Sequence, residues 1–384
     1  MVWVKVLIIF TAMLLSCYAL LIHVYRVWFR RLKPFKYEND AEPATRFSII
    51  IPARNEEVSI TTCIQSILQN NYPKQLVEII VIDDHSTDQT VNIVLKLQQQ
   101  HHNIRLIKLA DVLKGQQLNS YKKKAIEMAV AQSTGEWIVT TDADCIVTTD
   151  WLAVYDAYIR QYDPVFVAAP VMFLNTGSWV SIFQCLDFIS LQGITAASVS
   201  SGFHSMCNGA NLAYRKDVFN EVGAFKGIDS IASGDDMLLM HKIQTAYPKR
   251  IGYLFSQKAV VKTLPMPGWK SFINQRIRWA SKADSYNDRR IYWVLLYVYV
   301  LNLLLFLLPF TMHWYQPVFY YWLGLLLLKT FSEFTFMYFA ASFFDLQRLL
   351  RWFPFMQPFH ILYTVIAGWL GKFGKYQWKG RTVK

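Results

Sequence analysis

The chain has 384 residues, which is long enough for one large domain with appended segments, and a formal net charge of +12 at pH 7. Its five cysteines are widely spaced and form no paired metal-ligand pattern, so we expect reduced thiols rather than a cysteine metal site. A nucleic-acid-binding protein would carry its excess positive charge on the soluble domain. Here much of the excess lies beside apolar segments, where attraction to anionic lipid explains it, and we expect no nucleic-acid partner.

An apolar segment occupies residues 1–30. About twenty nearly uncharged residues follow Lys5, enough to cross the hydrocarbon core of a membrane. A cleaved signal peptide would need a shorter apolar stretch and a small-residue cleavage site, so the pattern predicts a retained transmembrane anchor. By the positive-inside rule, the basic residues near the end of this segment predict that this end faces the cytoplasm. These residues are Arg26, Arg30, Arg31, Lys33 and Lys36.

Residues 45–265 alternate between strand-like and helix-like patterns. The apolar runs typical of buried strands are residues 47–51, 77–82, 104–109 and 136–141. Apolar residues at helical spacing separate these runs, in segments that begin near Asn55, Asp88 and Lys122. The alternation predicts an α/β domain built on a doubly wound parallel sheet.

Polar loops follow three of the predicted strands. The most informative is Asp142-Ala143-Asp144, because two carboxylates one residue apart at the end of a strand can share a divalent cation such as Mg²⁺. The other loops run from Arg54 to Glu57 and from Asp83 to Asp88, and ligands of open α/β sheets bind at this edge. Asp83 and Asp84 have an alternative role as turn formers or helix caps. No glycine-rich dinucleotide fingerprint or Walker loop is present, so carboxylates and metal would have to hold any nucleotide.

Three further motifs extend this pattern. The lysines at residues 122–124 oppose the dipole at the start of a helix, which suggests a nearby anion such as a diphosphate. Asn208-Gly209-Ala210-Asn211 fits either a turn or a wall that a ligand approaches closely. Ser233-Gly234-Asp235-Asp236 precedes an apolar helix, where the acids are either ordinary N-terminal charges or include a general base.

Residues 266–288 contain a predicted amphipathic helix. Over residues 269–283 the apolar side chains share one face, which only Arg276 interrupts, and we expect this arginine to snorkel. Such a helix can lie in the membrane interface or pack on the core, and the apolar run that soon follows favours the interface. Gln275, Arg278 and Trp279 fall on adjacent flank positions of this helix, which we expect to face the soluble domain.

Residues 291–371 form a predicted C-terminal membrane region with two spans, near residues 291–311 and 317–344. The second span carries Lys329 and Glu333, which must pair, face protein or lie near an interface. Residues 353–370 contain two prolines and are expected to lie in the interface, with a third span as the alternative. The basic tail, residues 372–384, predicts a cytoplasmic C-terminus and therefore an even number of C-terminal spans.

Taken together, these motifs resemble membrane-associated glycosyltransferases of family 2, which have the GT-A fold. The resemblance extends from about Phe47 to Trp279 and rests on five motifs in the same order. These are Pro52-Ala53-Arg54-Asn55-Glu56, the segment from Val81 to Asp88, Asp142-Ala143-Asp144, Gly234-Asp235-Asp236 and Gln275-Arg276-Ile277-Arg278-Trp279. The resemblance implies a GT-A-type, doubly wound mixed sheet, with an N-terminal transmembrane helix and C-terminal transmembrane or interfacial helices.

The resemblance also implies a role for individual residues. The implied donor ligands are Glu56, Asp83, Asp84, Asp142, Gln275, Arg278 and Trp279, with Lys124 as a looser match. Asp144, helped by Asp142, would ligate Mg²⁺ or Mn²⁺. Asp236 matches the catalytic base, and Asp235 stands where the family often has glutamate. We expect Asn208, Gly209 and Trp279 at the acceptor.

The expected function is an inverting transfer of a sugar from a nucleotide-sugar donor to a lipid or carrier acceptor. We expect a multi-pass protein of the cell membrane with its catalytic domain, residues 45–265, in the cytoplasm. One alternative is a processive polysaccharide synthase, although two or three C-terminal spans are few for a channel within one protomer. A second is a non-catalytic membrane scaffold subunit, which would need a missing carboxylate, and none is missing.

Overall fold

The computed structural model describes residues 2–37, 42–113, 118–231, 234–282, 286, 288–374, 376–378 and 381–383. The chain divides into two compact units. The α/β unit consists of Lys33–Met172 and Ser205–Leu264, and the helical unit consists of Met1–Leu32, Phe173–His204 and Pro265–Lys384. Several sequence predictions fall outside the described residues, namely those for Ser233, Ala283, Lys375, Lys379 and Lys384.

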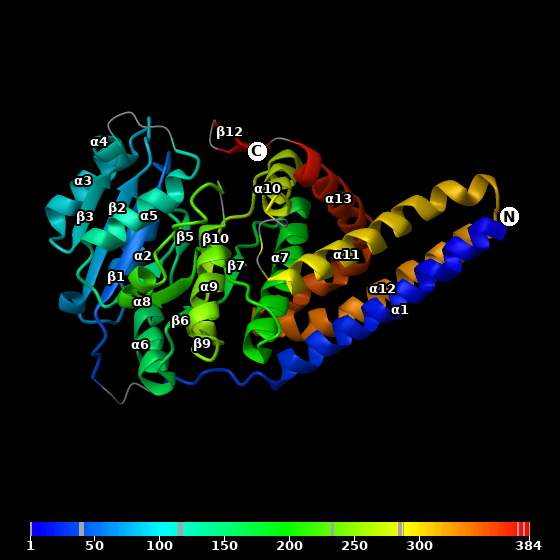
Figure 1. Cartoon of the computed structure of the whole chain (residues 1–384), viewed down its shortest axis with the longest axis horizontal. Helices are drawn as coiled ribbons and strands as arrows, with labels where there is room; N and C mark the ends of the chain where they lie inside the picture. Colours follow the sequence, from blue (N-terminus) through cyan, green and yellow to red (C-terminus); the bar gives the residue numbers. More distant parts are fainter. Residues whose placement is uncertain are drawn as a thin grey trace. The chain divides into compact units, whose positions relative to one another are not determined.

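A seven-stranded sheet forms the core of the α/β unit, with the strand order β3-β2-β1-β4-β8-β6-β9 (Figure 1). The strands are β1 (Phe47–Ala53), β2 (Val77–Asp83), β3 (Ile104–Lys108), β4 (Trp137–Thr140), β6 (Phe166–Ala168), β8 (Leu212–Arg215) and β9 (Ile251–Tyr253). The first four strands are parallel, whereas β8 is antiparallel to both of its neighbours. The mixed α/β sheet that the family resemblance implies is therefore confirmed, whereas the parallel sheet predicted from the alternation describes only β1 to β4 and the pair β6–β9.

The parallel strands read as continuous apolar runs because both faces of the sheet are covered. Ile49, Ile50 and Ile51 of β1 are fully buried, and so are Ile79 and Ile80 of β2. The helices of this unit are α2 (Ile60–Leu68), α3 (Thr90–Gln100), α4 (Leu109–Leu113), α5 (Tyr121–Gln132), α6 (Trp151–Tyr162), α8 (Lys216–Glu221) and α9 (Asp235–Ala246). The small strands β5 (Cys145–Ile146), β10 (Val261–Thr263) and β7 (Val171–Phe173) form a second sheet. The four predicted strands match β1 to β4 to within two residues, and the three predicted helices between them match α2, α3 and α5 to within about five residues at their starts.

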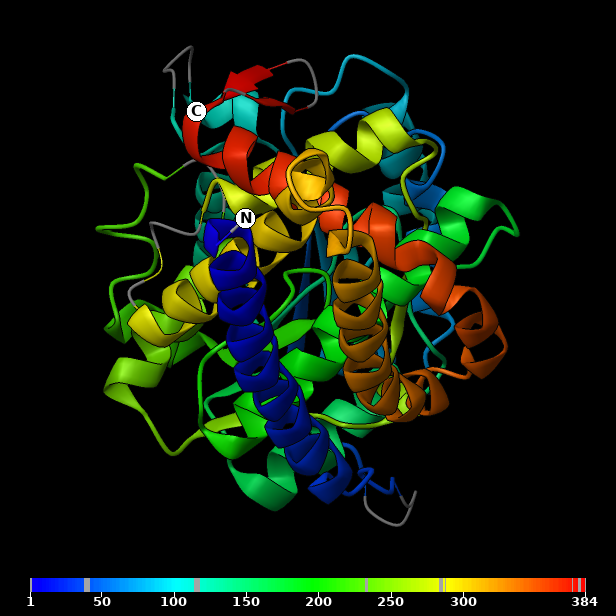
Figure 2. The same ribbon diagram turned by 90° about the vertical axis from the view of Figure 1, so that its right-hand side faces the viewer.

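The helical unit is built from long helices and a terminal hairpin. They are α1 (Val2–Arg31), α7 (Trp179–Ser201), α10 (Trp269–Ala280), α11 (Arg289–Leu307), α12 (Val318–Phe343), α13 (Phe353–Phe373), β11 (Tyr376–Trp378) and β12 (Arg381–Val383). Helices α1 and α12 lie side by side (Figure 1 and Figure 2), and the contacts of Tyr18 with Glu333 and of Phe29 with Phe336 show that they run in the same direction. A 3₁₀ turn, Gln347–Trp352, joins α12 to α13.

Four helical segments of the described chain are long and apolar enough to cross a membrane, by length and composition. They are Val2–Arg31, Trp179–Ser201, Arg289–His313 and Val318–Phe343. Three of them match the spans expected from the sequence, whereas α7 was not anticipated. Most of the apolar window of α7 is buried within the protein. Helix α13 is not among the four segments, and its expected place in the membrane interface stays a prediction.

The structure corrects the prediction for Arg276. Its guanidinium does not snorkel, since Arg276 is only 4% exposed and lies 2.6 Å from the Asp187 carboxylate. The apolar face of α10 packs within the helical unit. Ile277 of α10 and Ala367 of α13 are both buried in one apolar cluster. An arginine on such a face needs an ionic partner because a buried, unpaired charge is costly.

Candidate active site

The loops after β1 and β2 hold each other through their side chains. The Asn55 amide N–H donates to Ser86 Oγ at 2.9 Å, and the Thr87 amide N–H donates to Asn55 Oδ1 at 2.8 Å. The Glu56 amide N–H donates to Thr90 Oγ1 at 2.8 Å. Asn55 has a positive φ of 54°, a conformation that asparagine tolerates better than most residues. The two polar loops predicted at this edge of the sheet therefore form one connected surface.

The acidic residues of these loops are held in place. Asp83 and Asp84 are each 4% exposed. The Asp83 carboxylate accepts a hydrogen bond from the Ser86 amide at 3.2 Å, which is the turn-forming role considered from the sequence. His85 Nδ1 lies 2.9 Å from Asp84 Oδ1. Glu56 Oε2 accepts a hydrogen bond from Ser59 Oγ at 2.8 Å. These contacts fix the carboxylates without excluding a ligand.

Lys122 links the motif after β4 to the motif before α9. Its Nζ lies 2.9 Å from Asp142 Oδ1 and 3.4 Å from Asp235 Oδ2. Burial alone would lower the pKa of Lys122, but the Asp142 and Asp235 carboxylates outweigh burial and raise the pKa above its ordinary value. Lys122 is therefore a fixed positive charge between two acidic motifs that lie more than ninety residues apart in the sequence.

Lys122, rather than Lys124, is the lysine that reaches these carboxylates. Lys124 Nζ pairs with Glu127 of its own helix at 3.0 Å. Lys123 is buried, and its Nζ donates to the backbone oxygens of Ile228 and Ile231. Three consecutive lysines point in different directions because each residue turns the helix by about 100°. The donor-binding role expected for Lys124 stays a prediction.

Asp144 lies beside two buried thiols. Cys145 Sγ is 3.7 Å from Asp144 Oδ1, and Cys63 Sγ donates to the backbone oxygen of Asp142 at 3.5 Å. Burial, and after it the negative charge of Asp144, raises the pKa of both thiols above the ordinary range. The raised pKa favours the protonated thiols, which pack beside the Asp142-Ala143-Asp144 motif.

The residues expected at the acceptor and at the base meet at the N-terminus of α9. The Gly209 amide N–H donates to Asp236 Oδ2 at 3.0 Å, and the Met237 amide N–H donates to Asp236 Oδ1 at 2.8 Å. A Cβ atom at Gly209 would lie 3.4 Å from Asp235 Oδ2, which is ordinary van der Waals contact, so the Gly209 backbone lies directly beside both carboxylates. Gly234 directly precedes α9 as its N-cap, and its φ of 78° suits glycine. Both oxygens of Asp236 are thus oriented by backbone amides.

Tyr214 is a residue of this region that the sequence reasoning missed. It lines a small cavity together with Gly209, Asp235 and Asp236. Its buried hydroxyl has no hydrogen-bond partner within the described part of the chain. Burial, and to a smaller extent Asp235, raises the pKa of Tyr214. Its position in a four-residue strand gives no pattern that could have singled it out.

The remaining motif lies in the helical unit, on α10. Gln275 Oε1 accepts a hydrogen bond from Arg276 NH1 at 2.9 Å. The Arg276 Cζ atom lies over the Trp279 ring, 4.1 Å from the ring centre. The centres of the Trp279 and Phe188 rings are 6.0 Å apart. Arg278 follows on the next flank position of the helix, as the helical projection predicted.

The carboxylate oxygens that follow β4 are suitable ligands for a hard divalent cation. Among the described residues, no group of three or more histidine, cysteine, aspartate or glutamate side chains could enclose a metal. Mg²⁺ is usually held by one or two carboxylates together with substrate phosphates and water. Asp142 and Asp144 supply such carboxylates, and both are partly exposed. The residues therefore fit a metal that is completed by a bound diphosphate.

Comparison with known proteins identifies the family. The sequence model of glycosyl transferase family 2 matches residues 48–223, and that of glycosyl transferase family group 2 matches residues 137–370, more than half of the chain. The chain belongs to glycosyltransferase family 2. The resemblance inferred from the five motifs is confirmed, and with it the glycosyltransferase class of the enzyme.

The matches to individual relatives cover only part of each relative's length. The chain is 25% identical over 261 residues to the probable glycosyltransferase YdaM of Bacillus subtilis, covering 64% of this chain and 57% of YdaM. It is 30% identical over 132 residues to beta-monoglucosyldiacylglycerol synthase of Nostoc, covering 34% of this chain and 27% of the synthase. The chain thus spans little more than half of YdaM and about a quarter of the synthase.

A solved structure supports the GT-A fold. The mannosyltransferase PcManGT from Pyrobaculum calidifontis, in complex with GDP-Man and Mn²⁺, aligns with a TM-score of 0.57 and 16% identity. The alignment covers 95% of this chain and 99% of that protein. At this identity the similarity concerns the fold.

Proposed function

We propose that this glycosyltransferase transfers a sugar from a nucleotide-sugar donor to a lipid or carrier acceptor at the cytoplasmic face of a membrane. The observation that carries the proposal is the link that Lys122 makes between Asp142 and Asp235. It joins the carboxylates suited to a metal and diphosphate to the carboxylates suited to proton removal. A donor and an acceptor could thus be activated in one place.

The donor would be held along the edge formed by the first two strands and β4. Glu56, Asp83 and Asp84 offer acceptors for the nucleoside, as the resemblance implies. Lys122 is the cation that we assign to the donor diphosphate, because its charge is held beside Asp142. Gln275, Arg278 and Trp279 would hold the diphosphate and the acceptor end, again by resemblance.

Asp142 and Asp144 are the residues that would hold Mg²⁺ or Mn²⁺. When bound, such an ion neutralises charge on the departing diphosphate as a Lewis acid. The Mn²⁺ in the PcManGT complex supports a divalent ion at this place. Lys122 and Arg278 would add fixed positive charge on the protein side.

Asp236 is proposed to remove the proton from the acceptor hydroxyl. Its oxygens are already oriented by the amides of Gly209 and Met237, so little rearrangement is needed. The hydroxyl oxygen then bonds to the anomeric carbon as the nucleoside diphosphate leaves with the bonding electrons, which inverts the configuration. Asn208 and Gly209 would form the wall beside the acceptor.

A lipid acceptor is favoured by the helical unit. Its long helices expose large apolar side chains, such as Met13 at 64%, Leu327 at 60% and Phe331 at 68%. Exposed apolar surface of this kind marks contact with a membrane or a partner. The name of the Nostoc relative, a glucosyldiacylglycerol synthase, describes a glycolipid product. The processive synthase remains the alternative, and the length of the product distinguishes the two.

The test is a screen of the purified full chain against several nucleotide sugars with Mn²⁺, with and without membrane lipid extract. We expect one donor to be consumed and one sugar to be added to a lipid. The matched control is Asp236→Asn, which keeps the shape of the side chain and removes its basicity. A ladder of long products would establish the processive alternative. If no donor were turned over, the proposed function would be wrong.

A further inference from the structure

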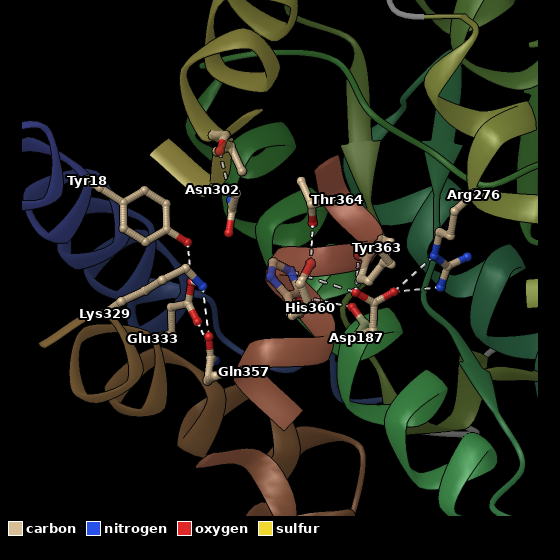
Figure 3. A network of polar contacts seen from close by, with 12 residues as sticks. Tyr18, Asp187, Arg276, Asn302, Lys329, Glu333, Gln357, His360, Tyr363 and Thr364 are labelled. Carbon is tan, nitrogen blue, oxygen red and sulfur yellow. Dashed lines mark hydrogen bonds and ion pairs between the residues drawn. The ribbon is translucent and has the colours of Figure 1, made fainter. Parts of the chain in front are cut away.

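A buried ion pair anchors the helix that carries the fifth motif. Arg276 of α10 and Asp187 of α7 are 4% and 6% exposed. The Arg276 Nε and NH2 groups both donate to Asp187 Oδ2, at 3.0 Å and 2.6 Å (Figure 3). Charges are buried at a large desolvation cost, which only good geometry and further hydrogen bonds offset.

Helix α13 completes the surroundings of the Asp187 carboxylate. The Tyr363 hydroxyl donates to Asp187 Oδ1, and His360 Nε2 lies 3.9 Å from the same oxygen (Figure 3). Both oxygens of Asp187 are therefore engaged, one by α10 and one by α13. This arrangement fixes where the carboxylate lies and, through it, where Arg276 lies.

The other side of the Arg276 guanidinium contacts the motif itself. Its NH1 group donates to Gln275 Oε1 at 2.9 Å. Its Cζ atom lies over the Trp279 ring, 4.1 Å from the ring centre, and over the Phe272 ring, 4.6 Å from the ring centre. One guanidinium thus touches two of the three motif residues to which substrate contacts are assigned, and Asp187 holds that guanidinium.

Helix attachment alone does not explain this pair. Apolar packing already joins α10 to α13, since Phe272 is fully buried and Ile277 packs with Ala367. A buried ion pair adds little to stability compared with apolar side chains of similar volume. Arginine offers a planar fork with five donors and a face for stacking, and lysine offers neither. Arg276 uses its fork to bind Asp187, its NH1 group to bind Gln275, and its face to contact the Trp279 ring.

We propose that Asp187 is a positioning residue: by fixing Arg276 it holds the Gln275 amide and the Trp279 ring in the orientation that sugar transfer requires. This inference rests on the proposed function, in which Gln275 and Trp279 contact the donor diphosphate and the acceptor. Asp187 itself touches neither substrate in this proposal. Its effect reaches the reaction only through Arg276.

Two variants of the pair test the inference. Asp187→Asn removes the charge that fixes Arg276. Arg276→Lys keeps an ion pair with Asp187 but cannot also bond Gln275 and stack on Trp279. We expect both to lower kcat/KM for transfer by roughly 10- to 100-fold, because small misplacements of positioning groups cost this much. Affinity for the nucleoside monophosphate, which lacks the second phosphate, should change by less than about threefold.

A second buried ion pair in the helical unit supplies the matched control. Lys329 Nζ pairs with Glu333 Oε1 at 2.7 Å, and Glu333 also accepts hydrogen bonds from Tyr18 and from Gln357 (Figure 3). These contacts join α1, α12 and α13. Glu333→Gln should lower the melting temperature about as much as Asp187→Asn does, while kcat/KM stays close to that of the wild type.

The outcomes separate the inference from the proposed function. If the wild type transfers sugar and Arg276→Lys retains full kcat/KM, the ion pair only attaches α10 to α7 and the inference is wrong. The same conclusion follows if Glu333→Gln loses as much activity as Asp187→Asn, because activity would then follow stability. If the wild type transfers sugar from no nucleotide-sugar donor, the proposed function fails and the inference falls with it.

Discussion

Individual charged residues carry most of the candidate chemistry, and Lys122 shows why their partners matter. The Asp142 and Asp235 carboxylates outweigh burial and raise the pKa of Lys122, so this side chain is a cation that can bind an anion and is not suited to accept a proton as a base. Proton removal therefore falls to a carboxylate. Asp142 and Asp144 would hold the metal. The carboxylates left for proton removal are Asp235 and Asp236, in the first turn of α9.

The metal assignment predicts a specific loss. Asp144→Ala removes one of two carboxylates that would hold the ion, and the neighbouring buried Cys145 stays in place. Donor turnover should be abolished, and donor affinity measured with Mn²⁺ should fall, while affinity without metal stays unchanged. Circular dichroism should show an intact fold. Wild-type turnover in this variant would remove the metal assignment.

The base assignment predicts a separation of chemistry from binding. Asp236→Asn can keep one of the two hydrogen bonds from the Gly209 and Met237 amides, because asparagine has one acceptor oxygen, and it removes the basic group. Transfer should fall by roughly 10²-fold or more, while donor affinity stays within a few-fold, because uniform binding is not what is lost. Asp235→Asn should cost less. If Asp236→Asn instead weakens donor binding and turns over normally at saturation, Asp236 is a donor ligand and Asp235 becomes the candidate base.

At the scale of the element, continuous patterns were predictable and tertiary contacts were not. The parallel strands were visible in the sequence because burial on both faces makes them unbroken apolar runs. Strands β6 and β9 have only three residues each, too few for a pattern, and the four-residue β8 is antiparallel to both of its neighbours. The pairs Lys122–Asp142 and Arg276–Asp187 join residues far apart in the chain, so local motifs identified some of these residues without revealing their partners.

The end of α7 predicts a pH dependence of stability. His204 is 2% exposed, and its Nε2 contacts Tyr25 and Ser198 at 3.1 Å each. Burial lowers the pKa of His204 to about 4, against an ordinary value near 6.5. The unfolded chain therefore binds a proton more readily than the folded chain between these two values. Stability is fully present above pH 6.5 and is lost as the pH falls toward 4.

The loss from this one group amounts to roughly 3 kcal/mol at most. Thermal unfolding at pH 7 and at pH 5 should show a lower melting temperature at pH 5. His204→Gln, which cannot take up a proton, should reduce this difference, whereas a variant of the exposed His102 should not. An unchanged pH dependence in His204→Gln would show that other groups cause the loss.

For the whole molecule, the directions of the long helices constrain the membrane topology. Trp3 contacts Trp314 near the start of α12, and Tyr18 and Phe29 contact Glu333 and Phe336 further along it. Helices α1 and α12 therefore end on the same side. Basic residues follow both ends, namely Arg30 and Arg31 in the last turn of α1, and Arg348 and Arg351 after α12. By the positive-inside rule, we expect this shared side to face the cytoplasm.

This argument predicts the location of two reporters. One is inserted at the exposed turn around Asp345, between α12 and α13, and the other is fused after Lys384. If α13 lies in the interface, as its two prolines suggest, both reporters should be active in the cytoplasm. A cytoplasmic Asp345 reporter with an external C-terminal reporter would show that α13 spans the membrane. If both reporters were external, the orientation would be reversed, and the proposed cytoplasmic donor site would be wrong, since nucleotide sugars could then not reach it from the cytoplasm.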